Sequence, residues 1–313
     1  MKTPPDSNPP DKPQSSTVSS FLAFATAIVV FLWACSLTPP DHTVTPGMAF
    51  SKSVASPMRA GGEFTFNAPI IVARSAIVID AETGETLFEK HADARLPVAS
   101  TQKLLTAMEA IASGGLDREA VVTLRDQLQP PTKLDLVAGT RYRRDDLLAA
   151  MLVSSANDAA SALASSARGS YGDFISNMNR RAKLLGARNS MFLNPHGLDA
   201  PGQHSTARDS AIIAYYAYRN PLIRHWVAQE MIPFTHSDGR TLMLENTNLL
   251  LWHRPAYFNG LKSGFTLQGG KCLIASAKYD HREIIIVLLG STQDAIFSDA
   301  KRLFRWQQKR DAP

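Results

Sequence analysis

The chain has 313 residues, enough for one large domain or two modest ones, and 44% of them are hydrophobic, so a sizeable core can form. The formal net charge is +5, but no run of Lys and Arg marks a nucleic-acid patch, and we expect no nucleic-acid partner. With only two cysteines, Cys35 and Cys272, a disulfide framework is not expected. The cysteines and the scattered histidines lack the spacing of metal ligands, so we expect no metal and no cofactor.

An apolar segment follows a short N-terminal tail rich in Pro and Ser. The run from Phe21 to Cys35 is almost wholly apolar, and the wider stretch 18–37 is just long enough to span a membrane. We interpret residues 1–37 as a tail with an export signal that is either cleaved or retained as a membrane anchor; lipidation at Cys35 is a less favoured third outcome. The Pro- and Gly-rich residues 38–70 predict a linker, and 71–313 a folded domain.

The folded part is predicted to begin with a β-hairpin, to continue with helices and to end with strands. Alternating and i, i+3, i+4 apolar patterns, with Gly and Pro at the breaks, give the boundaries. The predicted strands are 75–80, 85–90, 258–266, 271–277 and 283–290, and the predicted helices are 100–113, one around 147–152, 159–167, 174–185, 206–218 and 292–306.

These elements predict an α/β (α+β) fold. Short turns between the last three strands make them antiparallel, and the first hairpin joins them in one sheet of about five strands flanked by helices. An all-helical subdomain, roughly residues 144–230, is inserted between the two groups of strands. The cleft between sheet and insert is the expected place for a site.

Ser100 and Lys103 could form a nucleophile and its base. Their spacing at the start of a helix places both side chains on one face, and a buried lysine with a lowered pKa can accept the serine proton. Alone, the pair is weak evidence, because a capping serine followed by a surface lysine looks the same.

Two further motifs share the expected cleft. Ser155 and Asn157 lie in the break between two predicted helices, where a hydroxyl can relay a proton and an amide can hold a peptide carbonyl. Lys262, Ser263 and Gly264 lie on a predicted strand and offer a cation, a donor and close backbone access to a substrate carboxylate. An edge strand there could also pair with an extended peptide.

The three motifs occur in the order that is typical of penicillin-binding proteins and class A β-lactamases. The sequence resembles the low-molecular-mass penicillin-binding proteins, the serine D-alanyl-D-alanine carboxypeptidase family, with a DD-peptidase/β-lactamase-like fold, over about residues 70–308. The segments that carry the resemblance are Pro97–Lys103, Ser154–Ala160, Asn194–Asp199, Asn246–Leu250 and Asn259–Thr266.

The resemblance implies a role for each motif residue in an acyl-enzyme mechanism. Ser100 would attack a D-Ala-D-Ala-type bond, Lys103 would accept its proton, Ser155 would pass a proton to the leaving amine, and Asn157 would hold substrate.

The resemblance also implies how substrate binds. Lys262 and Ser263 would hold the terminal carboxylate, and the backbone N–H groups of Ser100 and Phe265 would form the oxyanion hole beside Gly264. Ser263 replaces the threonine more usual in the family but keeps the hydroxyl.

The implied protein is a DD-carboxypeptidase of the bacterial cell envelope, on the periplasmic side. Its partners would be peptidoglycan stem peptides and, as covalent inhibitors, β-lactams, with a membrane contact through an uncleaved N-terminal segment. A DD-endopeptidase that cleaves cross-links has the same motifs and stays open, because only the leaving group differs. A β-lactamase lacks support from a deacylating glutamate, and a catalytically silent binding protein is disfavoured because every catalytic position is filled.

Overall fold

The computed structural model describes residues 68–253 and 257–312. The predicted signal or anchor segment, 1–37, and nearly all of the predicted linker, 38–70, lie outside the described residues. The described residues all belong to one compact unit, Ser53–Pro313, and the boundaries of the predicted domains stay a prediction. In this part of the chain, no helix has the length and apolarity needed to cross a membrane.

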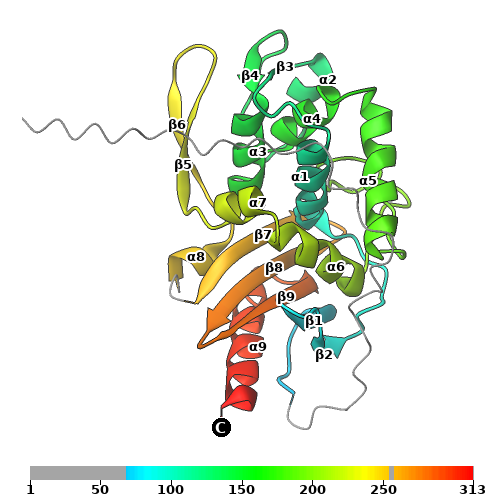
Figure 1. The fold of residues 1–313 in the computed structure, drawn as a ribbon, viewed down its shortest axis with the longest axis vertical. Coiled ribbons are helices and arrows are strands. Elements are labelled where there is room, and N and C mark those ends of the chain that lie inside the picture. The colour runs from blue at the N-terminus through cyan, green and yellow to red at the C-terminus, as the bar shows by residue number, and fades with distance from the viewer. Residues whose placement is uncertain (1–67, 254–256, 313) are drawn as a thin grey trace, which may run out of the picture. The chain divides into compact units, whose positions relative to one another are not determined.

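A five-stranded antiparallel sheet, as the sequence predicted, joins the two ends of the folded part (Figure 1). Its strand order is β2-β1-β9-β8-β7, so the N-terminal hairpin pairs with the last strand of the chain. The strands are β1 (Ser75–Asp80), β2 (Thr86–Lys90), β7 (Phe258–Thr266), β8 (Gly270–Tyr279) and β9 (Arg282–Ser291). This order leaves β7 at one edge.

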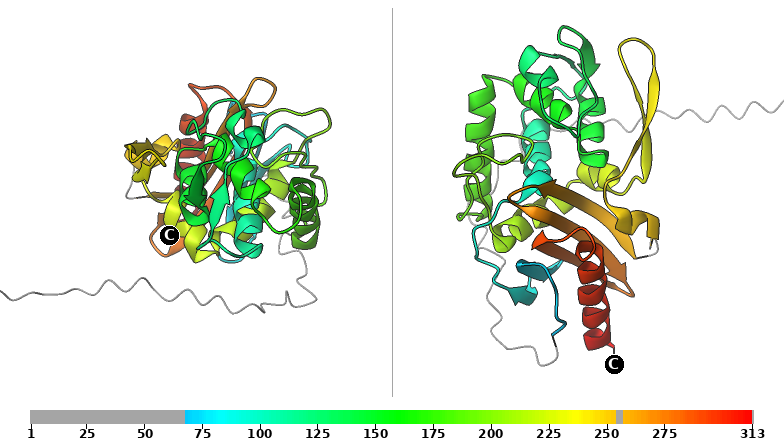
Figure 2. Two further views of the ribbon diagram at one scale, coloured as in Figure 1. Left: turned by 90° about the horizontal axis from the view of Figure 1, so that it is seen from above. Right: turned by 180° about the vertical axis from the view of Figure 1, so that it is seen from behind.

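Both faces of the sheet are covered, which explains the uninterrupted apolar run in β9. Ile285 and Val287 of β9 pack with the helical side, whereas Ile284 and Ile286 pack against the C-terminal helix α9 (Ile296–Asp311). Figure 2 shows α9 on the face opposite to most of the other helices. Strands buried on both faces lose the alternation of a half-exposed strand.

The helices of the other layer pack on the sheet and on one another, and local signals explain most of their ends. Asn220 caps α7 with Pro221 at its first position, and Gly186 ends α5 with φ 102°. These helices are α1 (Lys103–Ala112), α2 (Leu124–Gln127), α3 (Arg144–Val153), α4 (Asn157–Ser165), α5 (Tyr171–Leu185), α6 (Ala207–Tyr218) and α7 (Pro221–Val227). A further helix, α8 (Leu249–His253), contacts β7 and packs Leu250 in the core on the α9 side.

The segment predicted to be all-helical, 144–230, contains helices α3 to α7 and none of the named strands, as predicted. The sequence did not predict two small antiparallel sheets that lie on either side of this segment in the chain. One pairs β3 (Glu119–Val121) with β4 (Arg141–Arg143), and the other pairs β5 (Met231–Thr235) with β6 (Thr241–Glu245). The β5–β6 hairpin packs by Ile232 and Phe234, with Phe234 stacked on Tyr142 at 5.6 Å between ring centres. Strands this short give too little alternation to be read from sequence.

Candidate active site

Ser100 lies in a 3₁₀ turn, not in the first turn of an α-helix as predicted. The turn η1 spans Ala99–Gln102, and α1 follows it directly from Lys103. Ala99 has φ 51°, a left-handed conformation that turns the chain into η1 and leaves Ser100 half-buried.

Two glycines let other segments approach the backbone around Ser100. A Cβ on Gly197 would lie 2.1 Å from the Ala99 carbonyl oxygen, and a Cβ on Gly264 would lie 2.6 Å from the Ser100 nitrogen. No other residue type fits at either place. Gly264 thereby brings the β7 backbone against the N–H of the predicted nucleophile.

Lys103 is completely buried, and its ammonium nitrogen is surrounded by three oxygens. Nζ lies 2.8 Å from Ser100 Oγ, 2.7 Å from Asn157 Oδ1 and 2.7 Å from the His196 carbonyl oxygen. Lys103 therefore joins three segments that are far apart in sequence: η1, the start of α4 and the loop before α6.

The environment of Lys103 favours the neutral amine. Its pKa lies well below the usual value, first because burial removes water and second because Lys262 repels a positive charge, while Asp158 partly opposes the shift. A neutral amine has two hydrogens and one lone pair. The hydrogens match the Asn157 and His196 oxygens, which only accept, and the lone pair matches the Ser100 hydroxyl, which can donate.

Ser155 lies in the break between α3 and α4, as predicted, whereas Asn157 is the first residue of α4. Ser155 is buried with φ 67°, a conformation that a non-glycine residue adopts mainly where its surroundings impose it. Asn157 bonds the opposite loop twice, through its N–H to the Thr132 carbonyl at 2.8 Å and through Nδ2 to the Pro130 carbonyl at 3.0 Å. It thus fixes a wall of the site while it accepts from Lys103.

The buried carboxylate of Asp158 holds the same loop in place by hydrogen bonds. Its carboxylate accepts from the backbone N–H groups of Leu134, at 2.9 Å, and Leu136, at 3.1 Å, as well as from that of Ala159. Burial raises the pKa of Asp158, and these N–H groups lower it in part. The residue is more than a local cap, because it ties the 130–136 loop to α4.

Lys262 and Ser263 lie on β7 beside Thr247. Lys262 Nζ is 3.2 Å from Thr247 Oγ1, and Ser263 Oγ donates to Thr247 Oγ1 at 2.8 Å. Lys262 is also almost fully buried, and burial lowers its pKa to about 7. No carboxylate forms an ion pair with it within the described residues, so an incoming anion would meet a cation that is not already neutralised.

Phe265 completes the β7 motif at the edge of the sheet. Its ring is 53% exposed, and Lys271 Nζ lies 4.8 Å from the ring centre. Its backbone follows Gly264, next to the Ser100 N–H.

Three contributors were not assigned a role from sequence. The His196 carbonyl accepts from Lys103, Gly197 allows the close approach to Ala99, and Thr247 contacts both Lys262 and Ser263. The segments Asn194–Asp199 and Asn246–Leu250 were recognised only as part of the resemblance. The His196 ring itself is buried, and burial followed by repulsion from Lys103 lowers its pKa to about 3, so it stays neutral.

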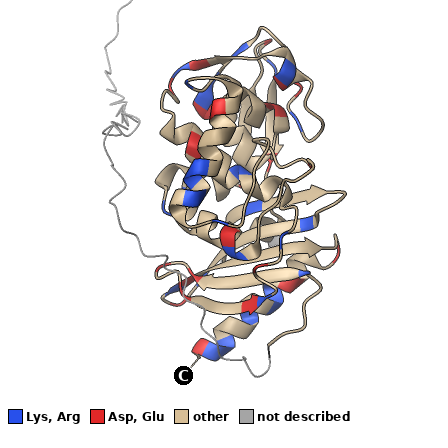
Figure 3. Cartoon of the chain, turned by 90° about the vertical axis from the view of Figure 1, so that its right-hand side faces the viewer, with Lys and Arg blue, Asp and Glu red and all other residues tan. Residues whose placement is uncertain are grey.

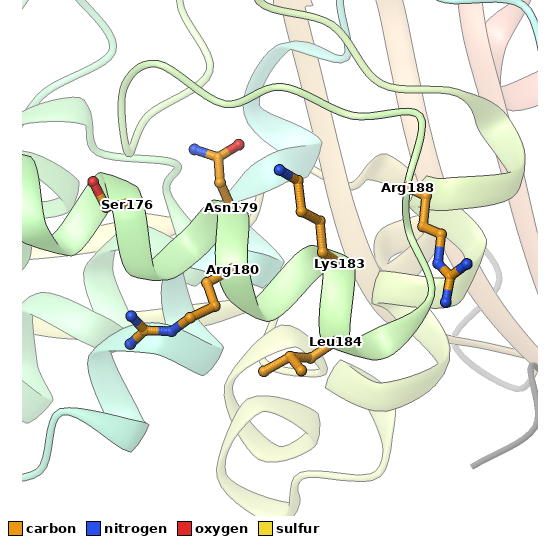
Figure 4. Close-up of a pocket in the computed structure, with 6 residues that line it drawn as sticks. All are labelled: Ser176, Asn179, Arg180, Lys183, Leu184 and Arg188. Carbon is orange, nitrogen blue, oxygen red and sulfur yellow. The ribbon is translucent and has the colours of Figure 1, made fainter. Parts of the chain in front are cut away.

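A separate hollow lies elsewhere on the described surface. It measures about 590 Å³ and is formed along one side of α5 and the turn after it, as Figure 4 shows. Its lining residues are Ser176, Asn179, Arg180, Lys183, Leu184 and Arg188. None of them contacts Ser100 or Lys103, and we assign the chemistry to the Ser100 site on the geometry of its side chains.

The sequence pattern of the D-alanyl-D-alanine carboxypeptidase family matches residues 63–293, which include every residue of the Ser100 site. The chain belongs to this family. Carboxypeptidase DacC of Escherichia coli is 33% identical over 80% of this chain and 65% of its own length. The D-alanyl-D-alanine endopeptidase of the same species is 32% identical over 77% of this chain and 79% of its own length.

Solved structures of relatives share the fold. A D-alanyl-D-alanine carboxypeptidase from Mycobacterium tuberculosis superimposes with a TM-score of 0.73 at 29% identity, covering 77% of this chain and 92% of that one. The Streptomyces K15 DD-transpeptidase gives a TM-score of 0.72 at 28% identity, covering 77% and 98%. The chain spans 65% of the length of E. coli DacC and 58% of that of Bacillus subtilis DacF.

Proposed function

We propose that this chain is a penicillin-sensitive serine DD-peptidase that cleaves D-Ala-D-Ala-type bonds in peptidoglycan stem peptides, with Ser100 as the acylated nucleophile. The observation that carries the proposal is the contact of a buried lysine amine with a serine hydroxyl, 2.8 Å from Lys103 Nζ to Ser100 Oγ. A base at hydrogen-bond distance and with a lowered pKa is what a serine nucleophile needs.

Acylation begins when Ser100 Oγ attacks the carbonyl carbon of the penultimate D-Ala. Its proton passes to the neutral Lys103 amine, and the carbonyl oxygen becomes an oxyanion. The backbone N–H groups of Ser100 and Phe265 stabilise that charge, each being worth about 3 kcal/mol. The close approach of Gly264 to the Ser100 nitrogen supports this oxyanion hole.

The intermediate then collapses. The C–N bond breaks, and the leaving amine takes the proton back from Lys103, with Ser155 as the relay. An ester on Ser100 remains, and water hydrolyses it by the reverse sequence of proton transfers. A β-lactam enters the same first step, but its leaving amine stays tethered to the acyl group, so the adduct persists.

Substrate orientation comes from β7 and Asn157. Lys262 and Ser263, next to Thr247, bind the terminal carboxylate of the stem peptide, and Asn157 holds a peptide carbonyl. Since β7 is an edge strand within the described sheet, an extended peptide can pair with its free backbone groups. Lys262 is buried and has no carboxylate partner among the described residues, which supports a substrate carboxylate as its partner.

Cleavage of cross-links is the second candidate. A curated endopeptidase relative matches over 79% of its own length at 32% identity, about as well as the carboxypeptidases do. The two reactions differ only in the leaving amine, which is free D-alanine in one and a neighbouring stem peptide in the other.

The proposed location is the bacterial cell envelope, on the periplasmic side, where the proposed substrate lies. Residues 1–37 would act as an export signal or membrane anchor, 38–70 as a linker and 71–313 as the catalytic domain. The apolar run from Phe21 to Cys35 supports this organisation.

The test uses the purified full chain with defined muropeptides and mass spectrometry, and Ser100→Ala as the control. Release of D-alanine from a monomeric pentapeptide supports the carboxypeptidase, and conversion of dimers to monomers supports the endopeptidase. Fast penicillin turnover without a lasting adduct would instead mean a β-lactamase. If Ser100→Ala and the parent protein behaved equally in every assay, the chain would be a catalytically silent binding protein.

A further inference from the structure

Helix α9 has two different faces. One face packs on the sheet through Ile296, Ala300, Leu303 and Phe304. The other carries basic residues and is here called the basic face; Figure 3 marks Lys and Arg in blue along the α9 ribbon. The basic face consists of Lys301, Arg302, Arg305, Lys309 and Arg310.

Among the described residues, the acidic side chains of α9 pair with only one cation of this face, Arg302. Asp299 is fully buried and accepts from the backbone N–H groups of Val72 and Ala73, at 2.8 and 2.9 Å. Asp311 bonds inward with Tyr279 and Arg282.

Three cations of the basic face are consequently left to solvent. Arg302 is 3.4 Å from Asp299, and the Arg310 guanidinium lies over the Trp306 ring at 4.7 Å. Within the described residues, Lys301, Arg305 and Lys309 take part in no ion pair. Their i, i+4 spacing aligns them along one line of the helix.

A small hollow lies between two of these cations. It measures about 70 Å³ and has Tyr257, Phe258 and Phe304 beside Lys301 and Arg305. Arginine and lysine are the usual ligands of a phosphate, and a tyrosine at the rim suits the headgroup region of a membrane.

The chain enters the domain at the same place. The bonds of Val72 and Ala73 to Asp299 hold the entering segment on the first turn of α9. Beside them Ile70 is 92% exposed and Val72 is 51% exposed, apolar surface without cover in the described residues. The apolar segment 18–37 lies upstream of this point in the sequence.

We propose that the basic face of α9 docks on an anionic phospholipid surface, with headgroup phosphates bound by Lys301, Arg305 and Lys309. Docking rests on the proposed anchoring by residues 18–37, which would hold the domain near the bilayer. The exposed Ile70 and Val72 favour a lipid surface over a wholly polar wall polymer. Since the Ser100 site is on the helical side of the sheet and α9 on the other, the docked enzyme directs its catalytic side away from the membrane.

The experiment uses the full chain in nanodiscs made either of phosphatidylcholine alone or of phosphatidylcholine with phosphatidylglycerol, both with a headgroup quencher. A fluorophore on Ala312→Cys, at the end of α9, reports the distance to the lipid, and one on Thr241→Cys, on β6, is the reference. We expect quenching of the α9 label only in anionic discs, and loss of quenching at high salt.

Charge reversal tests the residues themselves. Each basic residue at an anionic surface contributes roughly five-fold to binding, so Lys301→Glu with Arg305→Glu and Lys309→Glu should weaken docking by at least about 100-fold. The matched control makes the same change of charge in the α5 hollow and should dock normally: Arg180→Glu with Lys183→Glu and Arg188→Glu.

Activity on a soluble peptide confirms that each variant is folded. If a charge-reversal variant is inactive, the docking measurement is repeated with Gln in place of Glu at the same three positions. Equal quenching in the two kinds of disc, or an equal effect of the two triple variants, would overturn the proposal. Failure would leave the proposed peptidase function untouched, because peptide cleavage is measured separately. If the α9 variant instead lost sedimentation with purified peptidoglycan while docking normally, the face would bind wall polymer and not lipid.

Discussion

Replacing Gly197 by alanine should slow the acylation of Ser100, because the added methyl group displaces the backbone next to the nucleophile and not because it contacts the substrate. The added Cβ would lie 2.1 Å from the Ala99 carbonyl oxygen and 2.5 Å from its carbon, distances that real Cβ atoms do not show. The obstacle is backbone, so it cannot rotate away. The residue before the nucleophile has to move by roughly 1 Å, a misplacement that costs on the order of 100-fold in rate.

A matched control separates this clash from backbone strain. Gly202 lies in the same loop with the same φ of +90°, but a Cβ there would meet nothing within 4 Å. Both Gly→Ala variants carry the cost of a left-handed alanine, about 1–2 kcal/mol, which lowers the melting temperature. Only Gly197→Ala also displaces Ala99.

The assay compares the two variants by the second-order rate of labelling with a fluorescent penicillin, alongside thermal unfolding. We expect Gly202→Ala to be labelled at the parent rate and Gly197→Ala about 100-fold more slowly. Equal labelling rates for the two variants would refute the reasoning, because the loop would then not set the position of the nucleophile.

Four other changes probe the remaining parts of the site. Lys103→Arg should lower penicillin labelling by about 10²–10⁴-fold, since a guanidinium stays protonated and cannot accept the Ser100 proton; labelling near the parent rate would exclude Lys103 as the base. Ser263→Ala should raise KM for peptides up to about ten-fold through loss of one hydrogen bond, whereas Ser263→Thr should not; unchanged kinetics in the alanine variant would make the hydroxyl dispensable. Asp158→Asn should lower the free energy of unfolding in urea by about 2–4 kcal/mol, because it replaces a carboxylate that accepts from buried N–H groups such as that of Leu134. KM for a peptide with a free carboxylate should rise as the pH passes upward through about 7, where Lys262 loses its proton, while a C-terminal amide should show no such rise; parallel pH profiles would contradict the assignment.

The sheet could be predicted from sequence because its signals are local. The apolar run Ile284–Leu289 can only be a strand covered on both faces, and the turn residues around it fix its antiparallel neighbours. The 3₁₀ turn at Ser100 could not be predicted, since the φ of Ala99 is imposed by Gly197 and Gly264, which come from distant segments. The same holds for the β5–β6 hairpin, whose packing on Tyr142 is a tertiary contact.

In the candidate site, too, local sequence signals could be predicted and tertiary contacts could not. The residues that carry chemical groups were found as motifs, because a serine, a lysine and an amide are distinctive in type and spacing. The groups that position them were not found, because a backbone carbonyl has no sequence signature. The His196 carbonyl, 2.7 Å from Lys103 Nζ, is of this kind. Thr247 is a side chain, but its contact with Lys262 depends on how α8 and β7 meet.

The charge of Lys262 acts on Lys103, and this coupling gives the site a way to respond to substrate. Burial and, second, repulsion from Lys262 lower the pKa of Lys103, which favours the neutral amine that can accept a proton. A carboxylate bound at Lys262 would cancel that repulsion, because its charge offsets the ammonium. The proton affinity of Lys103 then rises just when Ser100 must lose its proton. A substrate with a terminal carboxylate should therefore be acylated faster than its amide even at saturation, a difference in kcat as well as in KM.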